Sequence, residues 1–345
     1  MRIGDRIRQA RVSAGMTLRD LAGRAAPLSA TAISRYEQGE DVPRPDTLQR
    51  LALALEVPTG YFFREISIRL ERPRYRKKSR FGLKAQQAVE GQITERLERY
   101  VEVESLFPPD RFPKPGVSPE DRRHIARLED AEEVAEEFRQ RWELGKDPIG
   151  NLAGTLEDRG VKVLLMDAPD GFDGLACWAN GEIPVVVANA SKSWDRQRFD
   201  LGHEFGELVL DSAPDVNSET AAHRFSGAFL VPAEVVRREL GSKRATLNLE
   251  ELLLLKMKYG LSMQAWVRRA FDTGVISEGT YSNLFRIFSI QGFRKNEPGG
   301  DRSPDHAQRF ELLVRQASSE GLMTQSFEEE LLRHTLRATK HEGSG

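Results

Sequence analysis

Residues 201–211, LGHEFGELVLD, combine one histidine and two glutamates at spacings that suit a metal site. His203 and Glu207 are four residues apart, so on a helix their side chains share one face. A zinc hydrolase needs two ligands one helical turn apart, a carboxylate beside the first to activate water, and a third ligand from elsewhere. This stretch therefore predicts a metal ligand at His203, a general base at Glu204, and an oxygen ligand at Glu207, where a second histidine is usual.

A second helical stretch, SETAAHRFSGAFLVP, provides Glu219 and, four residues further on, His223. These two side chains also share one helix face. Two imidazoles and two carboxylates from two helices are enough for a metal centre if the helices face each other. We therefore expect a zinc site built from His203, Glu207, Glu219 and His223.

The segments around these two helices predict an α+β domain over residues 130–290. Amphipathic patterns predict helices at 130–145 and 148–160, and helical patterns return from 195 to about 270. Three short apolar runs bounded by Gly, Pro, Asn and Asp predict strands at 161–167, 174–180 and 183–190. We expect these strands to form a small antiparallel sheet.

Residues 1–64 predict a compact all-helical domain. Apolar residues recur there at helical spacing in short blocks, and Thr17 and Ser29 are plausible N-caps of the second and third helices. Small side chains at Ala22 and Ala32 would let these two helices cross closely around a tight turn. That packing is typical of a helix-turn-helix unit, whose second helix enters the major groove of DNA.

The exposed face of this second helix predicts the DNA contacts. Small and polar side chains near base edges and arginines near phosphates are the expected classes of contact. The candidate residues are Thr17, Ser29, Ala30, Thr31 and Ser34, with Arg11, Arg35 and Arg44 near phosphates. The predicted partner is an operator in double-stranded DNA, and paired half-sites favour a homodimer.

The composition restricts both the class of protein and the kind of metal site. The single cysteine, Cys177, excludes an internal disulfide and any zinc cluster of several cysteines. No apolar stretch approaches the roughly 20 residues needed to cross a bilayer, and the first ten residues lack the apolar core of a signal peptide. We therefore expect a cytoplasmic protein without a membrane partner, whose metal ligands are histidines and carboxylates.

Charge is distributed unevenly along the chain. Residues 1–100 carry 20 Lys and Arg against 12 Asp and Glu, although the whole chain has a net charge of −2. The front of the chain is thus the part suited to a polyanion. Between Arg69 and Arg80 the basic residues predict either a solvated linker or a second arm that follows phosphates.

Two further segments complete the expected organisation. Residues 65–129 predict the basic linker and a connecting helix, whose helical stretch from Leu83 to Phe107 is a candidate dimer element. Residues 291–345 predict a polar linker followed by one or two C-terminal helices of unknown role.

Residues 3–63 resemble the XRE family of DNA-binding domains, which includes phage Cro and repressor. The segments RIRQAR, GMTLRDLA, AISRYEQG and LQRLALAL match that family in type and order. The resemblance implies operator binding by a helix-turn-helix. One departure is that Ala30 and Ala32 replace long amide side chains on the reading helix, so specificity is expected from methyl contacts, phosphates and DNA shape.

Residues 130–290 resemble the ImmA/IrrE family of zinc metallopeptidases. The resemblance is carried by NLAGTLEDRGVKVLLMD, FDGLACWANGEIPVVVANA, DRQRFDLGHEFGELVLD and AAHRFSGAFLVP. It implies that His203 is a ligand, Glu204 the general base and Glu219 the third ligand. Glu207 stands at the family's second histidine and His223 at its asparagine, so both departures fall on the site itself.

Together these features predict a multidomain, mainly α protein. An N-terminal all-α helix-turn-helix bundle would precede an α+β zincin-like domain with a small β-sheet. Two interpretations of the altered motif remain open: the metal site has been rebuilt with His223 in compensation, or it has decayed and the fold serves as a scaffold or sensor.

The resemblance gives two hypotheses about function. In one, the protein is a regulator of stress response or mobile-element genes, with a metallopeptidase-like domain that cleaves or senses a partner such as a repressor or toxin. In the other, it is a non-catalytic transcription factor or antitoxin whose peptidase-like domain only binds a ligand or partner.

Overall fold

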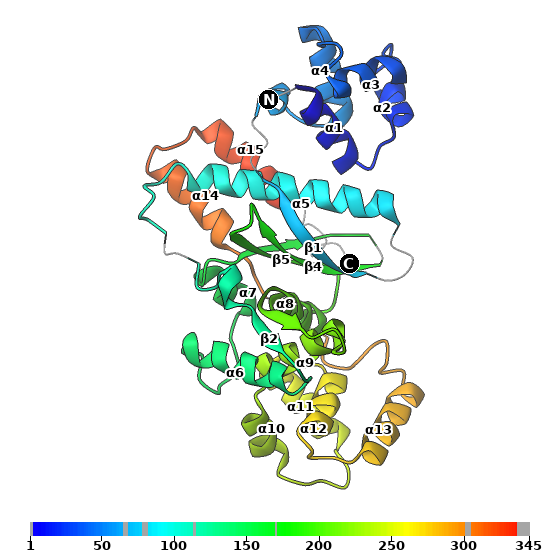
Figure 1. The fold of residues 1–345 in the computed structure, drawn as a ribbon, viewed down its shortest axis with the longest axis vertical. Helices are drawn as coiled ribbons and strands as arrows, with labels where there is room; N and C mark the ends of the chain where they lie inside the picture. The colour runs from blue at the N-terminus through cyan, green and yellow to red at the C-terminus, as the bar shows by residue number, and fades with distance from the viewer. Residues whose placement is uncertain are drawn as a thin grey trace.

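In the computed structural model, a small helical bundle lies at one end of an elongated molecule, a sheet lies in the middle, and further helices form the other end (Figure 1). The structure describes residues 3–64, 68–77, 82–112, 115–169, 171–300 and 305–336. The expected fold class is confirmed: the described chain is mainly helical, with an all-α N-terminal region followed by an α+β region.

The N-terminal bundle contains four α-helices and a closing 3-10 turn. These are α1 (Ile3–Ser13), α2 (Leu18–Arg24), α3 (Ala30–Gln38), α4 (Pro45–Leu55) and the turn Thr59–Phe63. Both predicted N-caps are confirmed: the hydroxyl of Thr17 accepts the Asp20 N–H at 3.1 Å, and that of Ser29 accepts the Ala32 N–H at 3.1 Å. Buried Leu21 and Ile33 join α2 and α3 to one core.

The central sheet has four strands in the order β1-β4-β5-β3. They are β1 (Leu70–Lys77), β3 (Lys162–Met166), β4 (Phe172–Ala179) and β5 (Ile183–Asn189). β4 is antiparallel to both β1 and β5, but β3 is parallel to β5. The expectation of a purely antiparallel sheet was therefore wrong. After α7 (Leu152–Asp158) and β3, the next strand, β4, lies on the far side of β5, and the antiparallel return from β4 to β5 leaves β5 parallel to β3.

β1 lies inside the segment that its composition assigned to a linker. Its basic residues and Pro73 mask the strand signal, and such residues are tolerated at a sheet edge, where one side of the strand makes no ladder bonds. The proposed phosphate-following arm at Arg69–Arg80 falls largely on side chains outside the described residues.

Two helical layers cover the sheet. On β5, Val185 and Val187 face α5 (Leu83–Glu104), whereas Val186 and Ala188 face the core that contains α8 (Trp194–Val209). This alternation is the period of two that a strand imposes on its side chains. The apolar face of α5 is thus used inside the chain, and a dimer contact through Leu83–Phe107 stays a prediction.

The N-terminal bundle docks on α5 through a buried arginine. Arg6 is fully buried, its Nη1 lies 2.5 Å from the Glu98 carboxylate, and its Nε donates to the Arg64 carbonyl at 2.8 Å. A buried charge of this kind needs its partners, so it ties the position of the bundle to that of α5.

Beyond the sheet, the peptidase-like region is helical. A short parallel pair, β2 (Arg123–Ile125) and β6 (Leu210–Ser212), lies beside these helices. The helices are α6 (Asp130–Arg141), α9 (Ser218–Leu230), α10 (Ala233–Leu240), α11 (Leu249–Tyr259), α12 (Met263–Asp272) and α13 (Glu278–Ile290). Leu252 of α11 and Trp266 of α12 are fully buried in the main core, so this helical pair packs inside the domain.

The C-terminal helices return to the middle of the molecule. α14 (Arg309–Ser319) and α15 (Gln325–Leu336) pack against the end of α5 around Tyr100 and Val103. The segment before α14 is held by Glu157 of α7, whose carboxylate accepts the backbone N–H groups of Gln308 and Arg309 at 3.0 and 3.2 Å. These helices therefore complete the core around α5.

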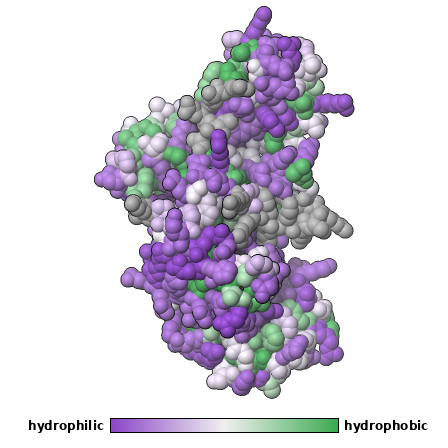
Figure 2. All heavy atoms as spheres, in the orientation of Figure 1, coloured by the Kyte–Doolittle hydropathy of each residue, from purple (hydrophilic) through white to green (hydrophobic). Residues whose placement is uncertain are grey.

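Among the described residues, no helix combines the length and apolar character that crossing a membrane requires. On the face drawn in Figure 2, hydrophilic residues predominate and apolar ones occur in small separate groups. This distribution is expected when the apolar faces of the helices are used internally.

The Glu157 contact predicts a pH-dependent stability. Burial raises the pKa of Glu157 to about 7 from its ordinary 4.5, against the opposing effect of the two N–H donors. The folded state thus holds the proton more tightly than the unfolded state, so the free energy of unfolding should fall by roughly 3 kcal/mol as pH rises between these values. In Glu157→Gln, urea unfolding across the same range should show a much smaller fall, and an equal fall in both proteins would contradict the assignment.

Candidate functional site

Helices α8 and α9 cross closely because two glycines of α8 face α9. A Cβ atom added at Gly202 would lie 2.7 Å from the Ser226 Oγ, and one at Gly206 would lie 2.9 Å from the Phe225 ring. The Ser226 hydroxyl also donates to the Phe199 carbonyl at 2.8 Å, which fixes α9 to the preceding turn of α8. The crossing brings the two predicted ligand-bearing faces together.

At this crossing, His203, Glu219 and His223 form one group. Their candidate ligand atoms all lie within 4.8 Å of one another. The Glu219 carboxylate lies 3.6 Å from His203 Nε2 and 3.4 Å from His223 Nε2. The side chain of His203 is 1% exposed, whereas those of Glu219 and His223 are 49% and 40% exposed, so the group is closed on the core side and open to solvent on the other.

The donor atoms of this group fit a zinc ion. Two imidazoles and one carboxylate are the ligand set of many catalytic zinc sites, in which a fourth position stays open for water or substrate. The partly exposed side of the group suits such an open position. A structural zinc site would instead need four protein ligands.

Glu204 lies in the core beside this group. It is fully buried, and a Cβ atom added at Gly174 of β4 would lie 2.4 Å from its Oε1. Only glycine at position 174 therefore leaves room for this carboxylate against the sheet. Sequence reasoning missed Gly174, although a glycine inside a strand is a known signal of close approach by another group.

Glu207 was expected in the ligand set, but the structure does not include it in the group. His223 stands in its place as the third donor. His223 comes from α9, and its ring lies 4.7 Å from that of His203 on α8, so the second imidazole of the group is contributed by the other helix. The pairing of His203 with Glu219 and His223 is thus a contact between helices.

The predicted DNA-reading residues gather on the outer side of α3 and its N-terminus. Ser29, Thr31 and Arg35 are exposed, and Ala30 and Ser34 are partly exposed. Thr17 is exposed at the start of α2, and Arg44 precedes α4. Arg35 forms only a loose ion pair with Glu40 at 3.8 Å, between side chains that are both more than half exposed.

Arg11 differs from the other predicted phosphate contacts. Its Nε and Nη2 donate to the Glu37 carboxylate at 2.6 and 2.7 Å, and its Nη1 donates to the Met16 carbonyl at 2.8 Å. The side chains of Arg11 and Glu37 are 13% and 7% exposed. The structure therefore gives Arg11 a different role from the one expected: it fastens α1 to α3.

Other residues that could suggest chemistry are parts of the core. Trp142 and Phe172 are buried. Burial raises the pKa of the Cys177 thiol to about 12, so this residue is not a nucleophile at neutral pH.

Comparisons with known proteins agree with these two units. A helix-turn-helix family model matches residues 7–62, and the peptidase-family model of the IrrE N-terminal-like domain matches residues 156–271. No curated protein matches the chain. A solved structure, the crystal structure of ComR from Streptococcus suis, is similar over 99% of this chain and 97% of its own, at 15% identity and a TM-score of 0.18.

The two family models match separate parts of the chain. They match the two regions in which the structure places the capped helix-turn-helix and the α8–α9 crossing. The chain thus joins an XRE-type helix-turn-helix domain to an IrrE-like peptidase domain.

Proposed function

We propose that this protein is a transcriptional regulator that binds operator DNA through α3 and hydrolyses a peptide bond in a protein partner at a rebuilt zinc centre. The observation that carries this proposal is the group formed by His203, Glu219 and His223 beside buried Glu204. A motif with two glutamates would have made the site more negative and its bound water less acidic. With His223 as donor, the site again has two neutral imidazoles and one carboxylate.

In this proposal the three ligands hold a zinc ion, which polarises a carbonyl and lowers the pKa of bound water when it is present. Glu204 accepts a proton from the attacking water and returns it to the departing amine. Its burial against Gly174 limits its rotamers and keeps the carboxylate directed at one place. The exposed side of Glu219 and His223 admits the partner chain.

The DNA-binding part of the proposal rests on the outer face of α3. Hydroxyls of Thr17 and Ser29 cap their helices as acceptors, so each retains its own proton for donation to a phosphate oxygen. Thr31 offers a methyl group and a hydroxyl to base edges, and Arg35 and Arg44 contact phosphates. A second copy on a paired half-site would complete operator recognition.

The alternative is a regulator or antitoxin without catalysis, in which the peptidase-like domain only binds a ligand or partner. The altered HExxE motif favours this alternative. The non-catalytic alternative predicts no stoichiometric zinc and no hydrolysis, so measurements of metal content and of activity distinguish the two functions.

The proposal predicts which substitutions remove zinc. Purified protein should contain about one zinc per chain by elemental analysis, since a site of three protein ligands holds one ion. His203→Ala and His223→Ala should each weaken zinc binding by more than about 100-fold, because even outer-shell partners contribute roughly 10–100-fold. Glu207→Ala should retain the metal.

His306→Ala serves as the matched control, since His306 is exposed and outside the metal group. Loss of zinc in Glu207→Ala together with retention in His223→Ala would show that Glu207 serves as the ligand at the position of the family's second histidine, and would contradict a site rebuilt around His223.

The role proposed for Glu204 predicts a separation of binding from catalysis. Glu204→Gln should retain zinc but lose a factor of roughly 10²–10⁴ in hydrolysis, which is the usual contribution of a general base. The measurement is mass spectrometry of a peptide library incubated with the zinc-loaded protein. Equal cleavage by both proteins would remove Glu204 from the mechanism, and no cleavage by either would favour the non-catalytic alternative.

The arginines of the N-terminal bundle predict two different phenotypes. Arg35→Ala and Arg44→Ala should each weaken binding to the promoter of the protein's own gene and reduce the salt slope by about one unit. Arg11→Ala should instead destabilise the bundle by roughly 3–5 kcal/mol, because it leaves the Glu37 carboxylate without its guanidinium. Mobility shift at several salt concentrations and thermal unfolding distinguish the two classes.

If Arg11→Ala lowered the salt slope with unchanged stability, Arg11 would be a phosphate contact after all. If the unsubstituted protein showed no preference for its promoter over random duplex, the proposed operator function would be wrong.

A further inference from the structure

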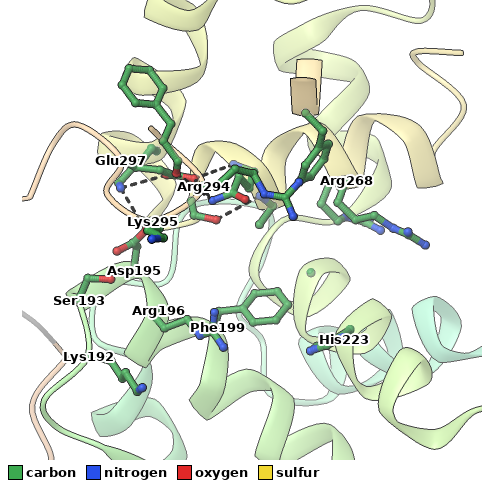
Figure 3. A pocket seen from close by; sticks show the side chains of 18 of the residues that line it. Lys192, Ser193, Asp195, Arg196, Phe199, His223, Arg268, Arg294, Lys295 and Glu297 are labelled. Carbon is green, nitrogen blue, oxygen red and sulfur yellow. Dashed lines mark hydrogen bonds and ion pairs between the residues drawn. The ribbon is translucent and has the colours of Figure 1, made fainter. Parts of the chain in front are cut away.

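A pocket of about 890 Å³ opens beside the metal group (Figure 3). One wall is formed by α8 and α9, which contribute Arg196, Phe199 and His223. Arg268 of α12 and Arg294 lie across the opening on the other wall. His223 lines the pocket and also belongs to the metal group, so the two share an edge.

The lining of this pocket is basic, although the whole chain is slightly acidic. Eight Lys and Arg residues line it against four Asp and Glu residues. Four of the eight are fixed by nearly buried carboxylates. Lys256 lies 3.1 Å from both Asp195 and Glu297, Arg224 and Arg269 lie 2.8 and 2.9 Å from Glu132, and Lys192 lies 3.0 Å from Asp173. These four support the fold, because their charges are neutralised.

The other basic side chains remain accessible to a ligand. Arg196 and Arg268 are 47% and 46% exposed, although each has an acidic partner on its own helix, Asp200 and Asp272, and Arg196 also lies 3.6 Å from Asp173. Arg294 and Lys295 are exposed and have no carboxylate partner in the part of the chain that the structure describes. Positive charge without a carboxylate partner therefore lies on the wall of Arg294 and Lys295, with the partly exposed Arg196 on the opposite wall.

Aromatic rings orient two of these guanidinium groups. The Cζ of Arg294 lies 5.0 Å from the Phe285 ring centroid, and that of Arg268 lies 5.9 Å from the Tyr281 ring centroid. Such stacking leaves the guanidinium edge free to donate to a carboxylate. The pocket thus combines apolar surface with directed donors for anions, a combination typical of ligand sites.

We propose that this pocket binds an acidic segment of a peptide, with carboxylate side chains on Arg294, Lys295 and Arg196 and apolar side chains on the aromatic rings. The proposal deepens the proposed function and rests on it, since it names the substrate class of the same metal centre. The segment lies with one end at His223, which places the neighbouring peptide bond at the metal group.

A phosphorylated small molecule fits the observations less well. Phosphate sites usually concentrate backbone N–H groups of a helix N-terminus or a glycine-rich loop on one point. Here the accessible cations come from α8, α12 and residues 294–295 and are spread along two walls with rings between them. That spread suits several carboxylates along an extended chain.

The test is a binding measurement on the full chain carrying Glu204→Gln, which prevents turnover. Three labelled ten-residue peptides of alternating Phe or Leu with Glu, Gln or Lys are titrated by fluorescence anisotropy, each with zinc and with a chelator. The Glu peptide should bind at least about tenfold more tightly than the Gln peptide, and the Lys peptide should bind least, because carboxylates pair with guanidinium groups.

Charge-reversal variants test whether the preference for the Glu peptide arises in the pocket. Arg294→Glu with Lys295→Glu should abolish the preference for Glu over Gln. The matched control is Arg286→Glu with Lys243→Glu, which makes the same change of charge at exposed positions outside the pocket and should keep the preference.

Three results would overturn the proposal: no preference for the Glu peptide, a preference that survives the Arg294 and Lys295 substitutions, or pyrophosphate that binds the pocket when the Glu peptide does not. The titrations with a chelator test peptide binding by the pocket independently of zinc binding at the metal centre. If the protein preferred the Glu peptide but bound no zinc, the proposed peptide site would be supported and the proposed zinc-dependent hydrolysis would be wrong.

Discussion

The close crossing of α8 and α9 is the constraint on which the functional part of this molecule depends. Gly202 and Gly206 remove the side chains that would hold the two helices apart, and Ser226 and Phe225 occupy the space. The contact has to be this close, because His203 comes from one helix and Glu219 and His223 from the other. Helix packing and metal-ligand geometry are therefore one requirement here.

This constraint explains how much of the site could be predicted from the sequence. The spacing between Glu219 and His223 predicts a shared helix face because the helical period is fixed, and the group confirms that the two lie together with His203. The same spacing also predicts Glu207 as a ligand, but Glu207 does not belong to the group. Sequence periodicity gives the face of a helix but not the turn at which a second helix meets it.

The fold shows the same division between local and long-range information. The helix caps at Thr17 and Ser29 depend on neighbouring residues and were predictable. β1 was not, because its basic residues fit a linker and its pairing with β4 joins segments about a hundred residues apart. Likewise, α5 carries an apolar face that suits a partner subunit equally well, and only the three-dimensional fold assigns that face to the sheet and to α14.

The central claim is that a histidine on α9 has replaced a histidine on α8 in the metal centre. X-ray absorption at the zinc edge tests it most directly, because imidazole ligands give a multiple-scattering signature that carboxylates lack. The account predicts two imidazoles in the zinc-loaded protein, one in His223→Ala, and two in Glu207→Ala. A single imidazole in the unsubstituted protein, or zinc bound only as a hydrated ion, would contradict the account.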